Sequence, residues 1–317
     1  MPEALESAFK ILYERPPEPG EVATLVAMGV MGAPTEQQLM RRILAATDRQ
    51  ALGSPFTIRF AERDIQYVEL EGFELALDTA DVAVSNDMIV RSTYETHLTA
   101  FMKDHVQPGM TVVDVGANVG YFSMLCSAIV GEEGRVLAFE PNTENARLFL
   151  LSVFKNKTSN IELHPIALAP HRGKAVFTPH QGSNGGLITS DLEQAVMNPN
   201  CQIVPTARLD DMVEGRVDFI KLDVEGAEGL VMAGAQRILE NYRPIVTSEY
   251  SPEMLGRISG VGPADYLRQF TRLGYTVQVL GRSGEAAPVE DIEAFVATYG
   301  AHTRIEDLAF LPPESTG

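Results

Sequence analysis

Short apolar runs alternate with amphipathic runs through the central and C-terminal parts of the chain. Runs of β-branched and other apolar residues indicate buried strands, and apolar residues three or four apart indicate helices. The expected strands cover residues 112–115, 135–139, 161–168, 217–222, 245–248, 276–280 and 306–311, and the expected helices cover 121–130, 143–157 and 263–273. Strands that alternate with helices predict a doubly wound α/β sheet.

The N-terminal part of the chain has a different pattern. Residues 1–52 carry apolar positions at helical spacing, interrupted by prolines and a glycine, and predict a helical accessory module. A docking or oligomerisation role and simple packing onto the main domain are both open for it. Residues 53–92 alternate polar and apolar side chains around a Glu71-Gly72 turn, which predicts a β-hairpin leading into the main domain at 93–317.

A glycine turn joins the first strand of the main domain to its helix. Asp114 lies near the end of the strand, Gly116 and Gly120 frame the turn, and Asn118 lies between them. Glycines let the backbone approach a ligand closely, and the helix N-terminus points free N–H groups into the same space. Glu140 ends the second strand, where an acid typically accepts both hydroxyls of a ribose. The pattern predicts a site for a nucleoside-bearing cofactor.

The residues of this turn favour S-adenosylmethionine (SAM) over a dinucleotide. Asn118 replaces a glycine of the dinucleotide fingerprint, and the carboxylate of Asp114 would repel a pyrophosphate. SAM has no phosphate and carries a sulfonium and an amino group, which suit an acid here. We expect Asp114 and Gly116 to line the methionine part of SAM. Asn118 and Gly120 then shape the turn, and Glu140 holds the ribose. A nicotinamide-dependent oxidoreductase and a turn without function are the alternatives.

The composition limits the partners of the chain. Its 317 residues include 43 acidic and 25 basic ones, which gives a formal net charge of −18. Nucleic-acid binding draws on clustered lysine and arginine, so this balance argues against a nucleic-acid substrate. Two cysteines provide neither a disulfide framework nor a metal-ligand spacing. The acidic N-terminus lacks a signal-peptide pattern and no apolar run approaches membrane-spanning length, so the expected location is cytoplasmic.

Four segments together resemble the FkbM-type methyltransferase family. They are Asp114–Gly120, Phe139–Pro141, Ile220–Glu228 and Pro244–Glu249, and the resemblance covers roughly 94–249. The run Ile-Lys-Leu-Asp-Val-Glu-Gly-Ala-Glu is its most specific part, because general methyltransferases do not share it. The resemblance implies a class I Rossmann-like methyltransferase fold, with a seven-stranded, mostly parallel sheet whose last strand is antiparallel. It also implies a SAM-dependent O-methyltransferase acting largely on hydroxyls of sugars and other natural products.

The resemblance extends the expected cofactor site beyond the glycine turn. Glu95 belongs to a Tyr-Glu pair that resembles a cofactor-side element, although an acid in the first turn of a helix also favours the helix dipole. Pro141 follows the ribose-binding acid Glu140 in the second matching segment. In a class I methyltransferase the end of the third strand lies over the adenine, which implies a contact from Ala167 or Ile166. A core position is equally compatible with Ile166.

Methyl transfer to a hydroxyl requires a group that takes or weakens its proton. The transfer is an in-line displacement at carbon, and a base or a divalent metal must activate the alkyl hydroxyl. Asp223 follows the strand 217–222 at the carboxyl edge of the sheet, where open α/β folds bind ligands. We expect Asp223 to contact the cofactor and to act as base or as a ligand of Mg²⁺, with Glu249 assisting. His97 is the second candidate base, because its usual pKa lies near neutrality.

Two further residues are candidates for contact with the acceptor. Asn184 lies in a glycine-rich segment within 170–210, a long excursion that is typical of a lid or binding loop. Glu225 follows Asp223 at the start of a helix, where stabilisation by the helix dipole is the alternative. The expected acceptor is a hydroxyl of a small molecule or glycan, and a homo-oligomer is compatible with the sequence. A catalytically inactive SAM-binding module and an RNA methyltransferase are the remaining alternatives.

Overall fold

The computed structural model describes residues 64–81, 84–179, 185–189, 192–198, 200–282, 285–299 and 305–313. The helical module predicted for residues 1–52 lies outside this part of the chain. So does Asn184, one of the two residues predicted to contact the acceptor. Among the helices that the structure describes, none combines the length and the apolar character needed to span a bilayer.

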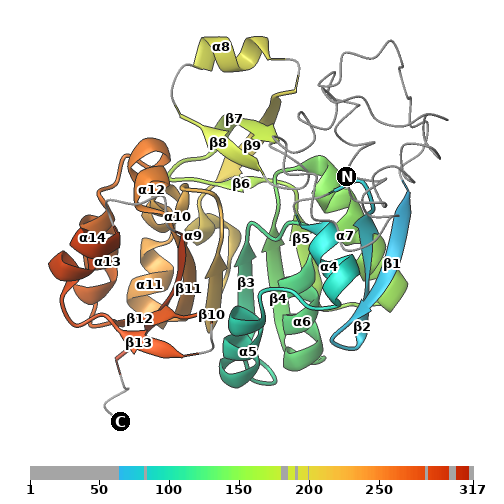
Figure 1. Cartoon of the computed structure of the whole chain (residues 1–317), viewed down its shortest axis with the longest axis horizontal. Helices are drawn as coiled ribbons and strands as arrows, with labels where there is room; N and C mark the ends of the chain where they lie inside the picture. The colour runs from blue at the N-terminus through green and yellow to red at the C-terminus, as the bar shows by residue number, and fades with distance from the viewer. Residues whose placement is uncertain are drawn as a thin grey trace, which may run out of the picture.

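A large mixed sheet forms the centre of the structure (Figure 1). Its strands lie in the order β13 (Ala286–Pro288), β12 (Thr276–Leu280), β14 (Glu306–Leu311), β11 (Ile245–Tyr250), β10 (Phe219–Leu222), β3 (Thr111–Val115), β4 (Arg135–Phe139) and β5 (Ile161–His164). The run from β11 to β5 is parallel, and β14 is antiparallel to both β11 and β12. The predicted Rossmann-like class I fold is therefore confirmed, with β13 as an additional edge strand.

The central strands are largely apolar because both of their faces are covered, and Asp114 on β3 and Lys221 on β10 are charged exceptions. On β3, Val112 packs with α6 (Tyr121–Val130) and α7 (Thr143–Asn156) on one face of the sheet. Its neighbour Val113 belongs to the cluster on the other face, with α11 (Gln236–Tyr242) and α13 (Pro263–Thr271). Successive side chains of a strand point to opposite faces, so an uninterrupted apolar run is what a doubly covered sheet requires.

A hairpin lies before the main domain as predicted, and the part of the prediction that covers residues 53–63 lies outside the described residues. Strands β1 (Ile65–Leu70) and β2 (Phe73–Asp78) pair across the Glu71-Gly72 turn. The backbone N–H of Ala76 donates to the hydroxyl of Ser152 on α7 at 2.9 Å, which ties the hairpin to the main domain. Residues 85–91 were expected to belong to the β lead-in, and they form the helix α4 (Ser85–Arg91) instead. The next helix is α5 (Thr96–His105), and Glu95 directly precedes it.

The segment expected as a flexible excursion folds into a second, four-stranded sheet. Its order is β6 (Ala167–Leu168), β9 (Gln202–Ala207), β7 (Gly173–Pro179) and β8 (Gly185–Ile188), with α8 (Leu192–Met197) between β8 and β9. The single strand predicted over 161–168 is wrong, because β5 ends at His164 and β6 joins the second sheet. Pro165 has no N–H to donate to the ladder, and the N–H of Ile166 turns back to the carbonyl of His164. Figure 1 places this sheet above the carboxyl ends of β3 and β10.

The remaining described helices cover the half of the large sheet that contains β10 to β14. They are α9 (Leu209–Met212), α10 (Glu228–Ala233), α12 (Pro252–Ile258) and α14 (Ile292–Tyr299), and Figure 1 shows them with α11 and α13 on the side away from the hairpin. Helix α10 begins directly after the loop that follows β10. The sequence therefore passes from a buried strand to a helix within a few residues at the carboxyl edge.

The two glycines of the first turn are required by contacts inside the protein. Both have positive φ angles, 77° at Gly116 and 94° at Gly120. A Cβ on Gly116 would lie 1.8 Å from the backbone oxygen of Asp223, and one on Gly120 would lie 2.2 Å from the ring of Phe149. The turn thus packs against the β10 loop on one side and against α7 on the other, which is a structural reason for the glycines beside any approach of a ligand.

Replacing Gly120 by alanine should destabilise the fold by about 2–4 kcal/mol, because left-handed backbone strain adds to the collision with Phe149. Gly215→Ala is the matched control, since Gly215 has a φ of 86° but its Cβ would meet nothing within 4 Å. The control should cost about 1–2 kcal/mol, the backbone strain alone. Chemical denaturation of both variants measures the difference, and equal losses would contradict the packing argument.

Candidate active site

A cavity of about 490 Å³ lies at the carboxyl ends of β3, β4, β10 and β11. Most of the residues predicted for the site line it: Glu95, His97, Gly116, Asn118, Glu140, Pro141, Ala167, Asp223, Glu225 and Glu249. Asp114 and Gly120 are not among the lining residues. The second sheet closes the cavity from above through Phe177 and Leu187. The carboxyl edge of the sheet is therefore the candidate site, as expected for an open α/β fold.

Glu140 is held rigidly at the end of β4, with both carboxylate oxygens bonded to the backbone. Its Oε2 accepts the N–H of Asn118 and its Oε1 accepts the N–H of Asn142, each at 2.8 Å. Burial raises the pKa of Glu140 to about 7, although the two backbone N–H groups oppose this shift. Each carboxylate oxygen keeps a second lone pair, so the group can still accept hydroxyls from the cavity. This geometry fits the predicted role in holding a ribose.

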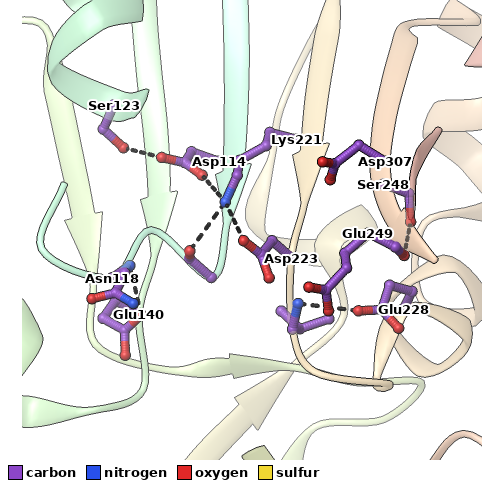
Figure 2. Close-up of polar contacts among 12 residues, drawn as sticks. Asp114, Asn118, Ser123, Glu140, Lys221, Asp223, Glu228, Ser248, Glu249 and Asp307 are labelled. Atoms are coloured by element: carbon purple, nitrogen blue, oxygen red, sulfur yellow. Dashed lines mark hydrogen bonds and ion pairs between the residues drawn. The ribbon is translucent and has the colours of Figure 1, made fainter. Parts of the chain in front are cut away.

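A buried lysine lies between two of the predicted acids (Figure 2). The ammonium of Lys221 on β10 lies 3.2 Å from Asp223 Oδ2, 3.8 Å from Asp114 Oδ1 and 3.5 Å from the carbonyl oxygen of Gly116. It also lies 5.1 Å from the ring centroid of Phe122. Lys221 is 3% exposed and Asp114 is completely buried. Of the two acids that contact Lys221, Asp223 lines the cavity and Asp114 does not.

The charge of Lys221 is maintained by its neighbours. Burial by itself would lower the pKa of Lys221, but the carboxylates of Asp223 and Asp114 outweigh burial and raise the pKa above its usual value. The pKa of Asp114 is raised by burial, against the effects of Lys221 and of the Ser123 hydroxyl, which donates to it at 2.6 Å. The predicted direct contact between Asp114 and the methionine part of SAM does not fit this geometry, because Asp114 lies behind Lys221.

Three further carboxyl groups meet Asp223 at the cavity. Glu95 precedes α5, Glu225 lies in the loop after β10, and Glu249 lies on β11. Burial, followed by the charge of Asp223, raises the pKa of Glu95 to about 7 and that of Glu225 to about 7. The same causes raise the pKa of Glu249 well above its usual value. Carboxyl groups that resist ionisation together create a site that favours a cation.

Glu228 belongs to the same loop but serves the fold. Its Oε1 accepts the N–H groups of Val224 and Gly226 at 3.1 Å and 3.2 Å, which closes the turn between β10 and α10. Gly226 has a φ of 96°, and its Cβ would lie 2.7 Å from the backbone of Met254. Glu228 is 1% exposed and does not line the cavity. The conformation of the loop that carries Glu225 therefore depends on Glu228.

His97 forms a dyad with an acid that the sequence did not single out. Its Nε2 lies 2.6 Å from Oδ2 of Asp307 on β14, and both residues line the cavity. The hydrogen bond that His97 donates to Asp307 raises the pKa of His97 above its usual value, against the effect of burial. Asp307 is also the register partner of Glu249 across β11 and β14. The dyad therefore lies beside the carboxyl cluster.

Three non-glycine residues of the cavity have a left-handed backbone. The φ angles are 36° at Glu95, 52° at Asn118 and 55° at Glu225. Such conformations cost energy and persist where the surrounding structure imposes them, often at functional sites. Here they direct an acid from the start of α5 and another from the β10 loop to the same cavity. The assembly of these side chains is therefore accompanied by local backbone strain.

The cavity has the properties that a nucleoside with a cationic group requires. Glu140 offers acceptors at one end, and the carboxyl cluster lies at the other. Apolar surface between them comes from Phe139, Ile166, Ala167, Leu168, Phe177 and Leu187. The side-chain oxygen of Asn118 is buried and has no hydrogen-bond partner among the described residues, which leaves an acceptor for a bound molecule. SAM fits this arrangement. Mg²⁺ is not supported, because the described residues contain no group of three acids, histidines or cysteines placed to hold a metal.

The sequence matches a known family over the region that builds this cavity. The model of the methyltransferase FkbM domain matches residues 114–277, more than half of the chain. The chain belongs to the FkbM methyltransferase family. The predicted resemblance is therefore confirmed, and membership supports SAM as the cofactor. It weighs against the nicotinamide-dependent oxidoreductase that the glycine turn had left open.

Individual relatives of this FkbM family member are distant. Protein-L-isoaspartate O-methyltransferase 1 of Arabidopsis thaliana is 28% identical over 113 residues, which are 34% of this chain and 47% of the relative. The match thus spans about half of that relative's length. A crystal structure of methyltransferase FkbM from Methylobacillus flagellatus has 16% identity and a TM-score of 0.39, covering 67% of this chain and 50% of that one. A SAM-dependent O-methyltransferase of Thermotoga maritima has 12% identity and a TM-score of 0.40, covering 80% and 79%.

Two residues of the site escaped sequence reasoning, and for one of them the sequence held a signal. Lys221 is a charged residue within a strand whose other side chains are apolar, and such a residue needs a buried partner. Asp307 is the second residue of the otherwise ordinary strand β14, and nothing in the neighbouring sequence points to His97. Only the insertion of β14 between β11 and β12 brings these two residues together.

Replacing Glu140 by alanine should weaken the binding of S-adenosylhomocysteine by about 2–4 kcal/mol, because charge-assisted hydrogen bonds to two hydroxyls are lost. Glu162→Ala removes an exposed carboxylate from the neighbouring strand β5 and should leave binding unchanged. Isothermal titration calorimetry on both variants, with circular dichroism to verify folding, makes the comparison. Equal affinities in the two variants would remove Glu140 from the cofactor site.

Proposed function

We propose that this chain is a SAM-dependent O-methyltransferase that transfers a methyl group to a hydroxyl of a sugar, glycan or other natural product. The observation that carries the proposal is a cavity with Glu140 at one end and the carboxyl cluster and the His97–Asp307 dyad at the other. The first end suits a ribose and the second suits a cation beside a proton acceptor. Membership in the FkbM methyltransferase family supports the reaction type.

The charge of the cavity favours a neutral acceptor over an anionic one. Glu95, Asp223, Glu225 and Glu249 surround the place where an acceptor would meet the methyl donor. A second carboxylate or a phosphate backbone would add repulsion at short range, in a setting with little screening by water. The Arabidopsis relatives, by their names, act on isoaspartate. We propose a hydroxyl acceptor for this chain, because a hydroxyl brings no charge into the cluster.

We propose His97 as the general base, in place of Asp223. The carboxylate of Asp223 is engaged by Lys221, so taking up a proton would cost it that ion pair. In the neutral tautomer that fits the dyad, Nε2–H of His97 donates to Asp307 and Nδ1 is the acceptor for the hydroxyl proton. Glu249 keeps a proton to higher pH than an ordinary acid and can hydrogen-bond the acceptor.

Besides general base catalysis, positioning of the acceptor contributes to the rate of methyl transfer. SAM, when bound, would supply a methyl group on a sulfonium, and loss of that methyl group would leave the neutral thioether S-adenosylhomocysteine. The residues of the cavity must hold the acceptor oxygen about 3–3.5 Å from that methyl group, and they exclude water from it. Phe177 and Leu187 of the second sheet form the apolar wall that performs this exclusion. The carboxylate of Asp223 faces the cofactor from the opposite side.

The proposal is tested by the chemical stability of the methylated product. The enzyme is incubated with SAM carrying a labelled methyl group and with separate panels of saccharides, hydroxylated natural products and isoaspartyl peptides. A hydroxyl acceptor gives a methyl ether that survives mild alkali, whereas a carboxyl acceptor gives an ester that releases labelled methanol. Alkali-labile label alone would contradict the proposal, and absence of any transfer with SAM bound would favour the inactive module.

The pH profile of turnover tests the base. Since His97 must be neutral to accept a proton, activity should rise as the pH increases through its raised pKa. His97→Asn should lower kcat by about 10²–10⁴-fold, the usual contribution of general base catalysis. Asp307→Asn removes the partner that raises the pKa of His97 and should shift the acidic limb of the profile to lower pH. An unshifted limb in Asp307→Asn would exclude the dyad, and Asp223→Asn is the matched variant for the alternative base.

A further inference from the structure

Lys221 occupies a position where an apolar side chain would serve the fold better. It lies in β10, whose four residues are all buried, between a face packed on α11 and a face packed on α6. Removing an ammonium from water costs several kcal/mol, and a buried ion pair seldom recovers more than that cost. Stability alone therefore gives little reason for a lysine here. The reason lies in what its ammonium contacts.

The contacts of Lys221 lead from the interior to the cavity. Asp114 on β3 is completely buried and is held by the hydroxyl of Ser123, so it forms a fixed inner partner. The carbonyl oxygen of Gly116 provides a second fixed oxygen. Asp223 is the outer partner, with a side chain that is 29% exposed, and only its Oδ2 contacts the ammonium. Its other oxygen has no bonded partner among the described residues and is available to a bound molecule.

The surroundings of Asp223 would otherwise work against its charge. Glu95, Glu225 and Glu249 all interact with it through repulsion between like charges. In a partly buried site, such repulsion would turn the side chain of Asp223 away from the cluster. The ammonium of Lys221 is the one cation within ion-pair distance of Asp223 in the described part of the chain.

We infer that Lys221 is a positioning residue, which holds the carboxylate of Asp223 directed at the positive groups of SAM, while Asp114 fixes Lys221 from behind. The inference depends on the assignment of this cavity to SAM, and the identity of the acceptor does not enter it. It also explains the buried acid of the glycine turn. Asp114 does not contact the cofactor itself but acts on it through Lys221 and then Asp223.

The test is a double-mutant cycle in a background that tolerates loss of the lysine. K221M alone would leave Asp114 as an uncompensated buried charge and could unfold the protein, so the reference is D114N, whose amide oxygen can still accept from Ser123. K221M, D223N and both together are then made in D114N. Calorimetric titration with SAM, in the absence of any acceptor, gives the affinities, and thermal unfolding shows that each variant is folded.

If Lys221 acts through Asp223, K221M should weaken SAM binding about tenfold, D223N should do the same, and the combination should be no weaker than D223N. K221R in the same background should return the affinity to within about threefold of D114N, because the cation beside Asp223 is restored. A structural role of the lysine would give the same loss with or without the D223N change, and either that result or unchanged affinity in K221M overturns the inference. Absence of SAM binding by the wild-type protein would overturn the cavity assignment as well.

Discussion

The ammonium of Lys221, placed between Asp114 and Asp223, is the interaction on which the site depends. It joins two adjacent parallel strands at the inner edge of the cavity. Removing the ammonium alone would leave Asp114 as a buried charge without compensation. Lys221 lies at the boundary between the core and the cavity. Asp114, on the core side, is fixed by packing, whereas Asp223, on the other side, lines the cavity.

The two ends of the cavity differ in their chemistry. At the β4 end, Glu140 is immobilised by two backbone N–H groups and presents its remaining lone pairs in a fixed direction. At the β10 and β11 end, the carboxyl groups of Glu95, Glu225 and Glu249 are tuned by burial and by one another. A neutral, hydroxyl-rich group suits the first end and a cation suits the second. The match to the methyltransferase FkbM domain agrees with this geometry, because SAM carries both a ribose and a cationic group.

Most of the fold was predictable because the central strands have little freedom. A sheet covered on both faces requires uninterrupted apolar runs, and the Asp114 to Gly120 segment can only be a tight strand-to-helix turn. The second sheet was not predictable, because β6 has two residues and its partner β9 lies more than thirty residues further along the chain. Sequence periodicity cannot report a pairing between such short and distant strands.

The candidate site was predictable in part, for a related reason. Residues that directly follow strands of the parallel sheet, such as Glu140 and Asp223, can be predicted as site residues, because the carboxyl ends of these strands share one edge. The burial of Asp114 was not predictable, because a sequence does not show that a lysine on the neighbouring strand lies between this acid and the cavity. The glycines Gly116 and Gly120 were assigned correctly to the turn, but the atoms that exclude a side chain there belong to Asp223 and Phe149.

The antiparallel strand β14 supplies what parallel strands cannot. A parallel strand brings its last residues to the carboxyl edge, whereas an antiparallel strand in the same sheet brings its first residues there. Asp307 is therefore delivered beside Glu249 at the beginning of β14, and it meets His97 from the start of α5. Its negative charge raises the pKa of both neighbours, which makes His97 a stronger base and helps Glu249 to retain a proton. One carboxylate, introduced by the direction of one strand, thus affects a candidate base and a neighbouring acid within a single cavity.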